Sequence, residues 1–138
     1  MDLKVKDVMF QDLPVLYEED TILSASKFMK KEKIRNLPVV GKDKKLVGLI
    51  TLRELVETVF KNPDHILIKD SMIKIVETVA PDESLSRAIE VMLLNKYGCL
   101  PVVDENKKLI GMLTEADLLK TLYDVSNLPS ELLKIKSK

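Results

Sequence analysis

Leu37-Pro38-Val39-Val40 returns 63 positions later as Leu100-Pro101-Val102-Val103, and this repetition decides how the chain is organised. With the same shift, residues 5–56 align with residues 68–119 without a gap, and 16 of the 52 pairs are identical. Two copies are too few for a solenoid, which needs about three or more repeats. They suit two half-units related by a pseudo-twofold axis, with a cleft between them that carries two related sites.

Composition indicates one compact domain made of these two half-units, because 46% of the 138 residues are hydrophobic. The 22 basic and 22 acidic residues cancel, so we expect no nucleic-acid partner. No apolar run approaches the roughly 18 residues that span a bilayer, so we expect no membrane insertion. The chain has one cysteine and begins without the apolar region of a signal peptide, which together predict a cytoplasmic protein.

Each repeat is expected to have the element order β-α-β-β-α. The expected strands are residues 13–17, 37–40 and 46–50 in the first copy and residues 76–80, 100–103 and 109–113 in the second. Thr21 and Ser84 stand where the first helix of each copy needs an N-cap. The second helices open at Thr51 and Thr114, and a last helical turn is predicted at 131–136.

Several short motifs, in this order and spacing, resemble the cystathionine-beta-synthase (CBS) domain. The first copy carries KDVM at 6–9, IRNLPVV at 34–40 and GLITLRE at 48–54. The second copy is closer still to the family pattern, with YGCLPVVD at 97–104 and GMLTEAD at 111–117. The chain therefore resembles a stand-alone tandem CBS pair, also called a Bateman module.

The resemblance implies an α+β (mixed α/β) fold, in which two β-α-β-β-α motifs form one module. We expect CBS motif 1 at residues 3–61, a linker at 62–65, CBS motif 2 at 66–124 and a tail at 125–138. The implied function is regulation without catalysis: AMP, ADP or ATP binds in the cleft between the motifs, and its occupancy is transmitted to a partner. The resemblance also implies a homodimer, an unidentified regulated enzyme or transporter, and no obligatory cofactor. Two alternatives are an interaction scaffold with vestigial sites and a module that binds S-adenosylmethionine.

Thr114 and Asp117 form the stronger predicted site. Free N–H groups at a helix start attract anions, so a phosphate can sit there with the Thr114 hydroxyl as a further donor. Asp117 can accept hydrogen bonds from ribose hydroxyls, as carboxylates do in dinucleotide-binding folds. The family uses the matching threonine and aspartate in these roles. The same spacing is also typical of a capping box, so both interpretations stay open.

Thr51 and Glu54 form the counterpart in the first copy, which we expect to be weaker or empty. Glutamate is one methylene longer than aspartate, so its carboxylate would be displaced from the ribose. Glu54 also completes a capping box. Arg35, assigned to this site, either reaches a phosphate or is a solvated cation at a helix end.

The resemblance assigns the adenine to an apolar slot beside the strands. In the second copy the slot residues are Thr78, Val79, Gly98, Cys99, Leu100 and Pro101. Their counterparts in the first copy are Val15, Leu16, Asn36, Leu37 and Pro38. Gly98 makes room for a ring, ends a helix, or does both. We expect Met72 and Ile75 to pack in the core in preference to lining the cleft.

The residue inventory disfavours catalysis and metal binding. A nucleophilic Cys99 would need a nearby base, and the single histidine, His65, falls in the break between the repeats. No cluster of histidine and cysteine offers metal ligands. The glycine-rich loop of P-loop nucleotide hydrolases is absent from the sequence. We therefore expect no catalytic residue and no metal site.

Overall fold

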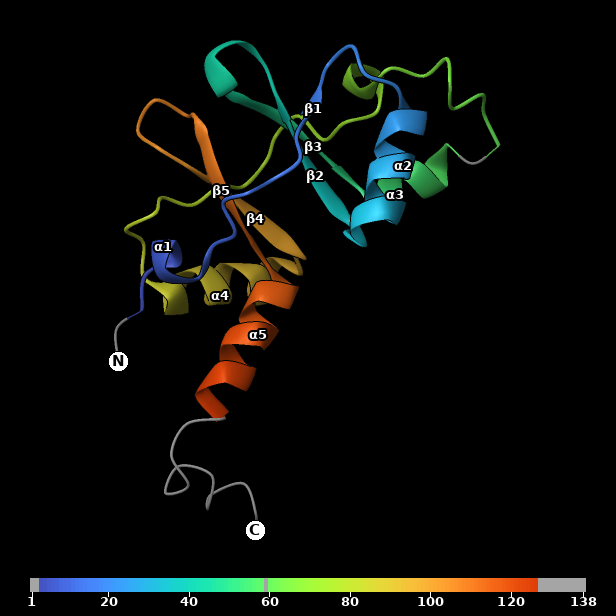
Figure 1. Ribbon diagram of the computed structural model, residues 1–138. Coiled ribbons are helices and arrows are strands. Elements are labelled where there is room, and N and C mark those ends of the chain that lie inside the picture. Colours follow the sequence, from blue (N-terminus) through green and yellow to red (C-terminus); the bar gives the residue numbers. More distant parts are fainter. Residues whose placement is uncertain (1–2, 59, 127–138) are drawn as a thin grey trace.

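The computed structural model describes residues 3–58 and 60–126, which form two halves, one for each repeat (Figure 1). In chain order the elements are α1 (Val5–Val8), β1 (Leu16–Tyr17), α2 (Ile22–Glu32), β2 (Asn36–Val40), η1 (Lys42–Lys44), β3 (Leu46–Thr51), α3 (Leu52–Glu57), η2 (Ile68–Asp70), α4 (Leu85–Asn95), β4 (Cys99–Val103), β5 (Leu109–Thr114) and α5 (Glu115–Ser126). This mixture of helices and small sheets confirms the predicted fold class. The helical turn predicted at 131–136 lies outside the described residues.

The first long helix of each repeat begins and ends in the same way. Thr21 Oγ1 accepts the Ser24 N–H at 3.2 Å, and Ser84 Oγ accepts the Arg87 N–H at 3.2 Å, so both predicted N-caps are confirmed. Each helix ends at a lysine in the left-handed conformation, with φ of 56° at Lys33 and 57° at Lys96.

None of the helices in the described part of the chain is long and apolar enough to cross a membrane.

The predicted hairpins are confirmed, but the predicted strand at 76–80 is wrong. β2 pairs with β3 and β4 with β5, both antiparallel, and each pairing has a register shift at equivalent positions. In the first repeat β1 adds a short parallel strand to β2, at residues 16–17 of the expected 13–17. In the second repeat only Val79 pairs, and it does so with Val102. Pro81 follows closely and has no N–H to continue such a ladder.

Each repeat's leading segment packs into the core of the other repeat. Val5, in the unpredicted helix α1, is fully buried with the second repeat's Val79, Leu100 and other core residues. Ile68, its equivalent 63 positions on, is fully buried in the core of the first repeat. The two hydrophobic cores are therefore completed crosswise.

We call the two places where a leading segment packs on the other repeat the crossings. Backbone hydrogen bonds and ion pairs hold both crossings together at equivalent positions. Leu85 N–H donates to Leu3 O at 2.8 Å, and Ile22 N–H donates to Ile66 O at 2.9 Å. The Lys6 Nζ lies 3.0 Å from an oxygen of Asp82, and the Lys69 Nζ lies 3.0 Å from an oxygen of Glu19. These paired contacts follow the 63-residue shift, so the two halves are related by a pseudo-twofold axis.

The axis passes between the two hairpins. Lys45 forms an isolated antiparallel β-bridge with Lys108, its equivalent in the other repeat. The neighbouring Leu46 N–H donates to Lys107 O at 3.1 Å. A small buried cluster lies across the same axis and consists of Leu49, Cys99 and Met112 with the partly buried Leu13 and Val76. Leu49 and Met112 are repeat equivalents, so each half contributes the same surface to this contact.

Candidate functional site

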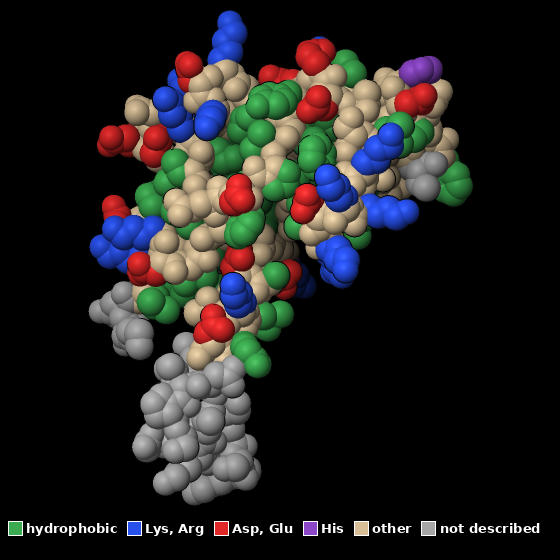
Figure 2. All heavy atoms as spheres, in the orientation of Figure 1, with side chains coloured by type: hydrophobic (Ala, Val, Ile, Leu, Met, Phe, Trp, Pro, Cys, Tyr) green, Lys and Arg blue, Asp and Glu red, His purple; other side chains and the backbone are tan. Residues whose placement is uncertain are grey.

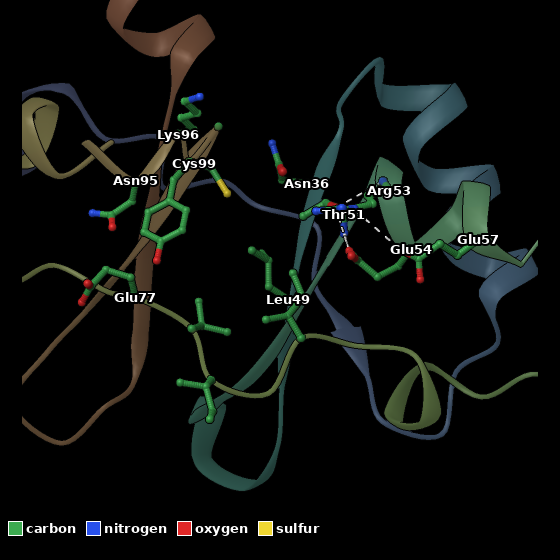
Figure 3. A pocket seen from close by; sticks show the side chains of 15 residues that line it. Asn36, Leu49, Thr51, Arg53, Glu54, Glu57, Glu77, Asn95, Lys96 and Cys99 are labelled. Carbon is green, nitrogen blue, oxygen red and sulfur yellow. Dashed lines mark hydrogen bonds and ion pairs between the residues drawn. The ribbon is translucent and has the colours of Figure 1, made fainter. Parts of the chain in front are cut away.

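A cavity of about 610 Å³ opens between the two repeats (Figure 3). One wall comes from the end of β3 and the start of α3, and the opposite wall from the end of α4 and the start of β4. Its lining consists of Asn36, Leu49, Thr51, Arg53, Glu54, Glu57, Ile73, Ile75, Val76, Glu77, Asn95, Lys96, Tyr97, Gly98 and Cys99. Because the walls belong to different repeats, packing of the two halves creates the cavity.

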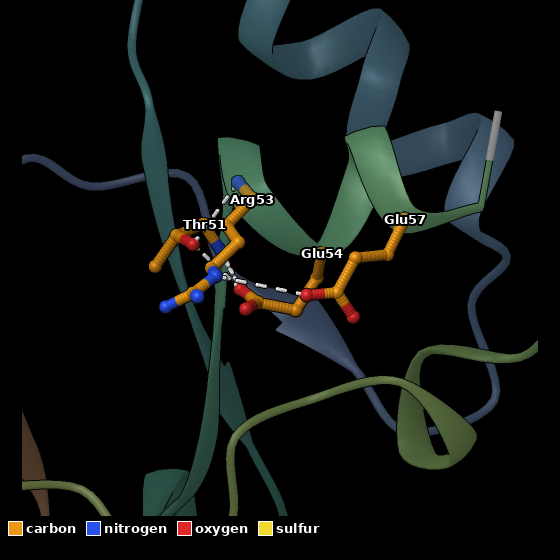
Figure 4. Close-up of polar contacts among 4 residues, drawn as sticks. All are labelled: Thr51, Arg53, Glu54 and Glu57. Atoms are coloured by element: carbon orange, nitrogen blue, oxygen red, sulfur yellow. Dashed lines mark hydrogen bonds and ion pairs between the residues drawn. The ribbon is translucent and has the colours of Figure 1, made fainter.

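The start of α3 is closed by a hydrogen-bonded cap at this wall (Figure 4). Glu54 Oε1 accepts hydrogen bonds from the Thr51 N–H and from the Thr51 hydroxyl, each at 2.6 Å. Glu54 is only 8% exposed. Among the described residues, no donor contacts its other oxygen, Oε2, which leaves one acceptor for a ligand hydroxyl.

Arg53 and Glu57 lie beside this cap and face each other. Arg53 Nε is 3.7 Å from Glu57 Oε1, and both side chains are largely exposed. α3 has six residues, so few peptide dipoles align to attract an anion at its start. The positive charge of Arg53 is also partly neutralised by Glu57.

Thr114 and Asp117 form the same arrangement at the start of α5. Asp117 Oδ2 accepts the Thr114 N–H at 2.9 Å and the Thr114 hydroxyl at 2.8 Å. In return, Thr114 Oγ1 accepts the Asp117 N–H at 3.2 Å. Both threonine–acid pairs are therefore capping boxes, and each keeps one carboxylate oxygen without a donor among the described residues. The role of these pairs in ribose and phosphate binding stays a prediction.

A smaller cavity of about 230 Å³ adjoins Asp117. Its lining residues are Asp7, Val8, Met9, Phe10, Asp117, Lys120, Thr121 and Asp124. The repeat equivalents of Phe10, Asp117 and Lys120 are Ile73, Glu54 and Glu57, and all three line the larger cavity. The two cavities thus occupy related places, and the larger one lies beside Glu54.

The predicted base-slot residues divide into two groups. Asn36, Gly98 and Cys99 line the larger cavity. The others line neither of the two cavities: Leu16, Leu37, Pro38, Val79, Leu100 and Pro101 are buried, and Val15 and Thr78 are half-buried. These buried residues contribute to the two cores or to the strands beside them. Arg35, assigned to the Thr51/Glu54 site, is exposed and also lines neither cavity.

The structure groups the site residues across the repeats. Gly98 and Cys99, which belong to the repeat of Asp117, lie in the cavity of Thr51 and Glu54. Asp117 itself lines the smaller cavity, and the backbone of Arg35, the equivalent of Gly98, lies at the start of α3, where its carbonyl accepts the Leu52 N–H at 2.9 Å. Residues assigned to one site because they share a repeat therefore belong to different clefts.

The CBS domain family matches residues 5–61 and 68–124, which is most of the chain. The chain belongs to the CBS domain family. A homoserine O-acetyltransferase of Methanohalobium evestigatum is 33% identical over 120 residues. These residues are 87% of this chain, but the chain spans only about a quarter (24%) of that relative's length.

Solved structures confirm a tandem CBS pair. AcuB from Vibrio cholerae has a TM-score of 0.85 and 28% identity, with 95% of this chain and 98% of that chain covered. The CBS domain pair of protein MJ0100, in complex with 5′-methylthioadenosine and S-adenosyl-L-methionine, has a TM-score of 0.79 and 26% identity. The match to MJ0100 covers 90% of this chain and 98% of that chain.

Sequence reasoning missed much of the lining of the larger cavity, on both of its walls. The missed lining residues are Leu49, Arg53, Glu57, Ile73, Val76, Glu77, Asn95, Lys96 and Tyr97. The expected core position of Ile75 is wrong, because its side chain is 95% exposed and lines the cavity. Leu49 and Ile73 exchange backbone hydrogen bonds of 3.0 and 2.9 Å, after which the chain leaves the sheet. Tyr97 had one usable signal, since it directly precedes Gly98 and Cys99.

Cys99 contributes a neutral wall to the cavity. Burial raises the pKa of the Cys99 thiol to about 12, and the charge of Glu115 acts in the same direction. The thiol is therefore protonated at neutral pH and is a poor nucleophile.

His65 lies in the turn after α3, with Nδ1 3.2 Å from Asn62 Nδ2. Over residues 3–58 and 60–126, no group of three or more histidine, cysteine or acidic residues is placed to hold a metal ion.

Proposed function

We propose that this CBS pair is a regulatory module that binds an adenine nucleotide, or a related adenosine derivative, between its two motifs. The larger cavity carries the proposal, because its opposite walls offer the two features that adenosine needs. The Glu54 wall has an unused carboxylate oxygen for ribose hydroxyls, and the other wall has the aromatic ring of Tyr97 for the base. Its volume of about 610 Å³ is typical of a small-molecule site.

The Thr114/Asp117 side is the proposed site for the ribose and phosphate of a nucleotide. α5 has 12 residues against six in α3, so its start has the stronger field for an anion, and this field has to offset the three carboxylates that line the smaller cavity with Lys120. Arg35 is exposed, and a contact from its side chain to a bound phosphate is part of the proposal. The matching threonine and aspartate of the family support this assignment.

Occupancy is proposed to reach a partner protein through the relative placement of the two motifs. A ligand in the cavity contacts both motifs, so it stabilises the arrangement in which both walls are within reach. One contact that must adjust is the buried cluster of Leu49, Cys99 and Met112, which lies between the two motifs. A ligand shifts such an equilibrium only by the difference in its affinity for the two arrangements.

A calorimetric and thermal-shift panel tests this function. It contains AMP, ADP, ATP, S-adenosylmethionine and 5′-methylthioadenosine, with GTP as the control for base recognition. A ligand at about 100 times its dissociation constant adds roughly 2.7 kcal/mol of stability. For a chain of this size we expect a rise of several degrees in melting temperature. The absence of heat and shift with every adenosine compound would contradict the proposal.

The second candidate is a homodimeric interaction scaffold with vestigial sites. It is favoured by the two capping boxes, which already use one oxygen of each carboxylate, and by apolar side chains exposed on the helices. They include Leu93, Leu94, Leu119 and Leu122, each at least 64% exposed, and Figure 2 shows hydrophobic side chains at the surface near α5. Apolar patches commonly mark interfaces, so a homodimer is proposed in either case. Light scattering that gives one chain mass at micromolar concentration would contradict it.

A further inference from the structure

Carboxylates stand at both ends of the larger cavity. Glu54 and Glu57 lie on the α3 side, and Glu77 lies on the opposite side, near Asn95 (Figure 3). The lining contains three carboxylates and only two cations, Arg53 and Lys96, which leaves one net negative charge. Whichever way a long ligand lies, one of its ends approaches a carboxylate.

The groups that usually hold phosphate are occupied or weak in this cavity. The Thr51 N–H and hydroxyl already donate to Glu54 at 2.6 Å. Arg53 is 3.7 Å from Glu57, and α3 is only six residues long. A phosphate dianion would therefore meet repulsion from carboxylates without a free cluster of donors.

Apolar surface is available in the same place. Ile73, Ile75 and Tyr97 line the cavity and are 38%, 95% and 40% exposed. An aromatic ring and two aliphatic side chains can cover a purine and a thioether. Binding then removes apolar surface of both groups from water, which is favourable. Side chains so exposed on the rim of a cavity are typical of a ligand-binding surface.

We infer that the larger cavity takes a phosphate-free adenosine derivative, whose 5′ group is uncharged or positively charged. This inference rests on the proposed function, because it assumes that the module binds adenosine compounds. 5′-Methylthioadenosine represents the uncharged class, and S-adenosylmethionine, with one net positive charge, represents the cationic class. Even in water, each carboxylate a few ångströms from a phosphate weakens binding by roughly fivefold. AMP should therefore bind in this cavity at least about tenfold more weakly than 5′-methylthioadenosine.

Isothermal titration calorimetry with three probes tests the charge argument. Wild-type protein is titrated with 5′-methylthioadenosine, S-adenosylmethionine and AMP, and so is the variant Glu57→Lys. The variant should bind AMP about tenfold more tightly and S-adenosylmethionine several-fold more weakly than the wild type does. Its affinity for 5′-methylthioadenosine should stay within about twofold of the wild-type value. Glu105→Lys is the matched control: it makes the same charge change in the exposed turn beyond β4, where screening should leave all three affinities within about twofold.

Ile75→Ala locates the binding event. Ile75 is 95% exposed, so its truncation should leave the melting temperature of the free protein unchanged and weaken 5′-methylthioadenosine about fivefold. Preference for 5′-methylthioadenosine over AMP, with sensitivity to Ile75→Ala, supports the inference.

Three outcomes would overturn it, and they separate it from the proposed function. AMP binding at least as tight as 5′-methylthioadenosine, and weakened by Ile75→Ala, overturns the inference while the proposed function stands. If 5′-methylthioadenosine binds tightly and its affinity is unchanged by Ile75→Ala, the assignment to this cavity is overturned. The proposed function stands in that case too. Failure of every adenosine probe to bind overturns the proposed function, and the inference with it.

Discussion

The two CBS motifs share one backbone but surround different cavities. The capping boxes of Glu54 and Asp117 are built alike, yet the cavity beside Glu54 measures about 610 Å³ and the one beside Asp117 about 230 Å³. Many of the residues that are identical in both repeats lie in the hairpins, such as Leu37–Val40 and its counterpart Leu100–Val103. Several equivalent positions around the cavities differ in charge or polarity: Glu57 and Lys120, Arg53 and Ala116, Gly98 and Arg35, and Ile75 and Asp12. The repeated residues thus determine the fold, while the differing ones set the chemistry of each cleft.

The leading segments show the opposite behaviour, because they are equivalent in sequence and in role. Val5 completes the core of the second motif and Ile68 that of the first, and both are fully buried. Neither core is complete without a segment that precedes the other motif in the chain. Stability should therefore depend on both crossings.

The largest effect is expected from truncation inside the crossings. Ile68→Ala should lower the free energy of unfolding by about 3 kcal/mol, because it removes a buried aliphatic chain and leaves a cavity. Val5→Ala removes fewer atoms and should lower it by about 2 kcal/mol. Urea denaturation measures both changes, and Ile75→Ala, at a position 95% exposed, is the control with less than about 0.5 kcal/mol expected.

Hydrogen exchange can show which core each substitution affects. Ile68→Ala should increase exchange first in α2 and β2, and Val5→Ala should do so first in α4 and β4. If instead each substitution loosened the motif that follows it in the chain, the crosswise assignment would be contradicted.

An intermediate effect is expected at the capping acids. Asp117→Ala should weaken AMP by about 1.5–3 kcal/mol, because hydrogen bonds to a charged group are lost, while Glu54→Ala should weaken it less. Each variant also loses a helix cap worth about 1 kcal/mol, so calorimetry is run well below both melting temperatures. Thr114→Ser keeps the hydroxyl and is the matched control. Equal losses, or a larger loss from Glu54→Ala, would contradict the ranking of the two sites.

The sequence predicted what local patterns encode. Thr21 and Ser84 could be placed as caps because an N-cap acts within three residues of itself. The crossings have no such signal, since Val5 reaches a core whose other members begin at Val79. α1 is a single turn of four residues, which is too short for a helical period to show.

Five residues that the sequence nominated for a site, namely Asn36, Thr51, Glu54, Gly98 and Cys99, line the larger cavity, but their grouping could not be read from the sequence. Aligning the repeats identifies Gly98 as the equivalent of Arg35, but it does not say which helix start lies opposite each of them. The pseudo-twofold axis decides that, and it places Gly98 beside Glu54. Ile75 was assigned to the core because it is aliphatic, although the hydrogen bonds that hold the chain to β3 end at Ile73.

The smallest effect is expected from the ion pairs that fasten the crossings. The hydrogen bond and charge of Lys6 lower the pKa of Asp82 below its ordinary value of 3.8, and Asp82 in turn raises the pKa of Lys6. Stability from Asp82 is therefore present above the ordinary carboxyl pKa and is lost as the pH falls through the lowered value. Stability from Lys6 is present below its ordinary pKa of 10.5 and is lost as the pH rises through the raised one.

Asp82→Asn and Glu19→Gln compare the two crossings directly at neutral pH. Both pairs are largely exposed, so each substitution should lower the melting temperature only slightly, and only at low salt. Asp82→Asn should have the larger effect, because Lys4 also lies 3.9 Å from that carboxylate. At about 1 M NaCl the Debye length falls to roughly 3 Å, and both differences should disappear. A loss that persisted at high salt would show that these side chains hold the crossings by packing or neutral hydrogen bonds, and that charge is secondary.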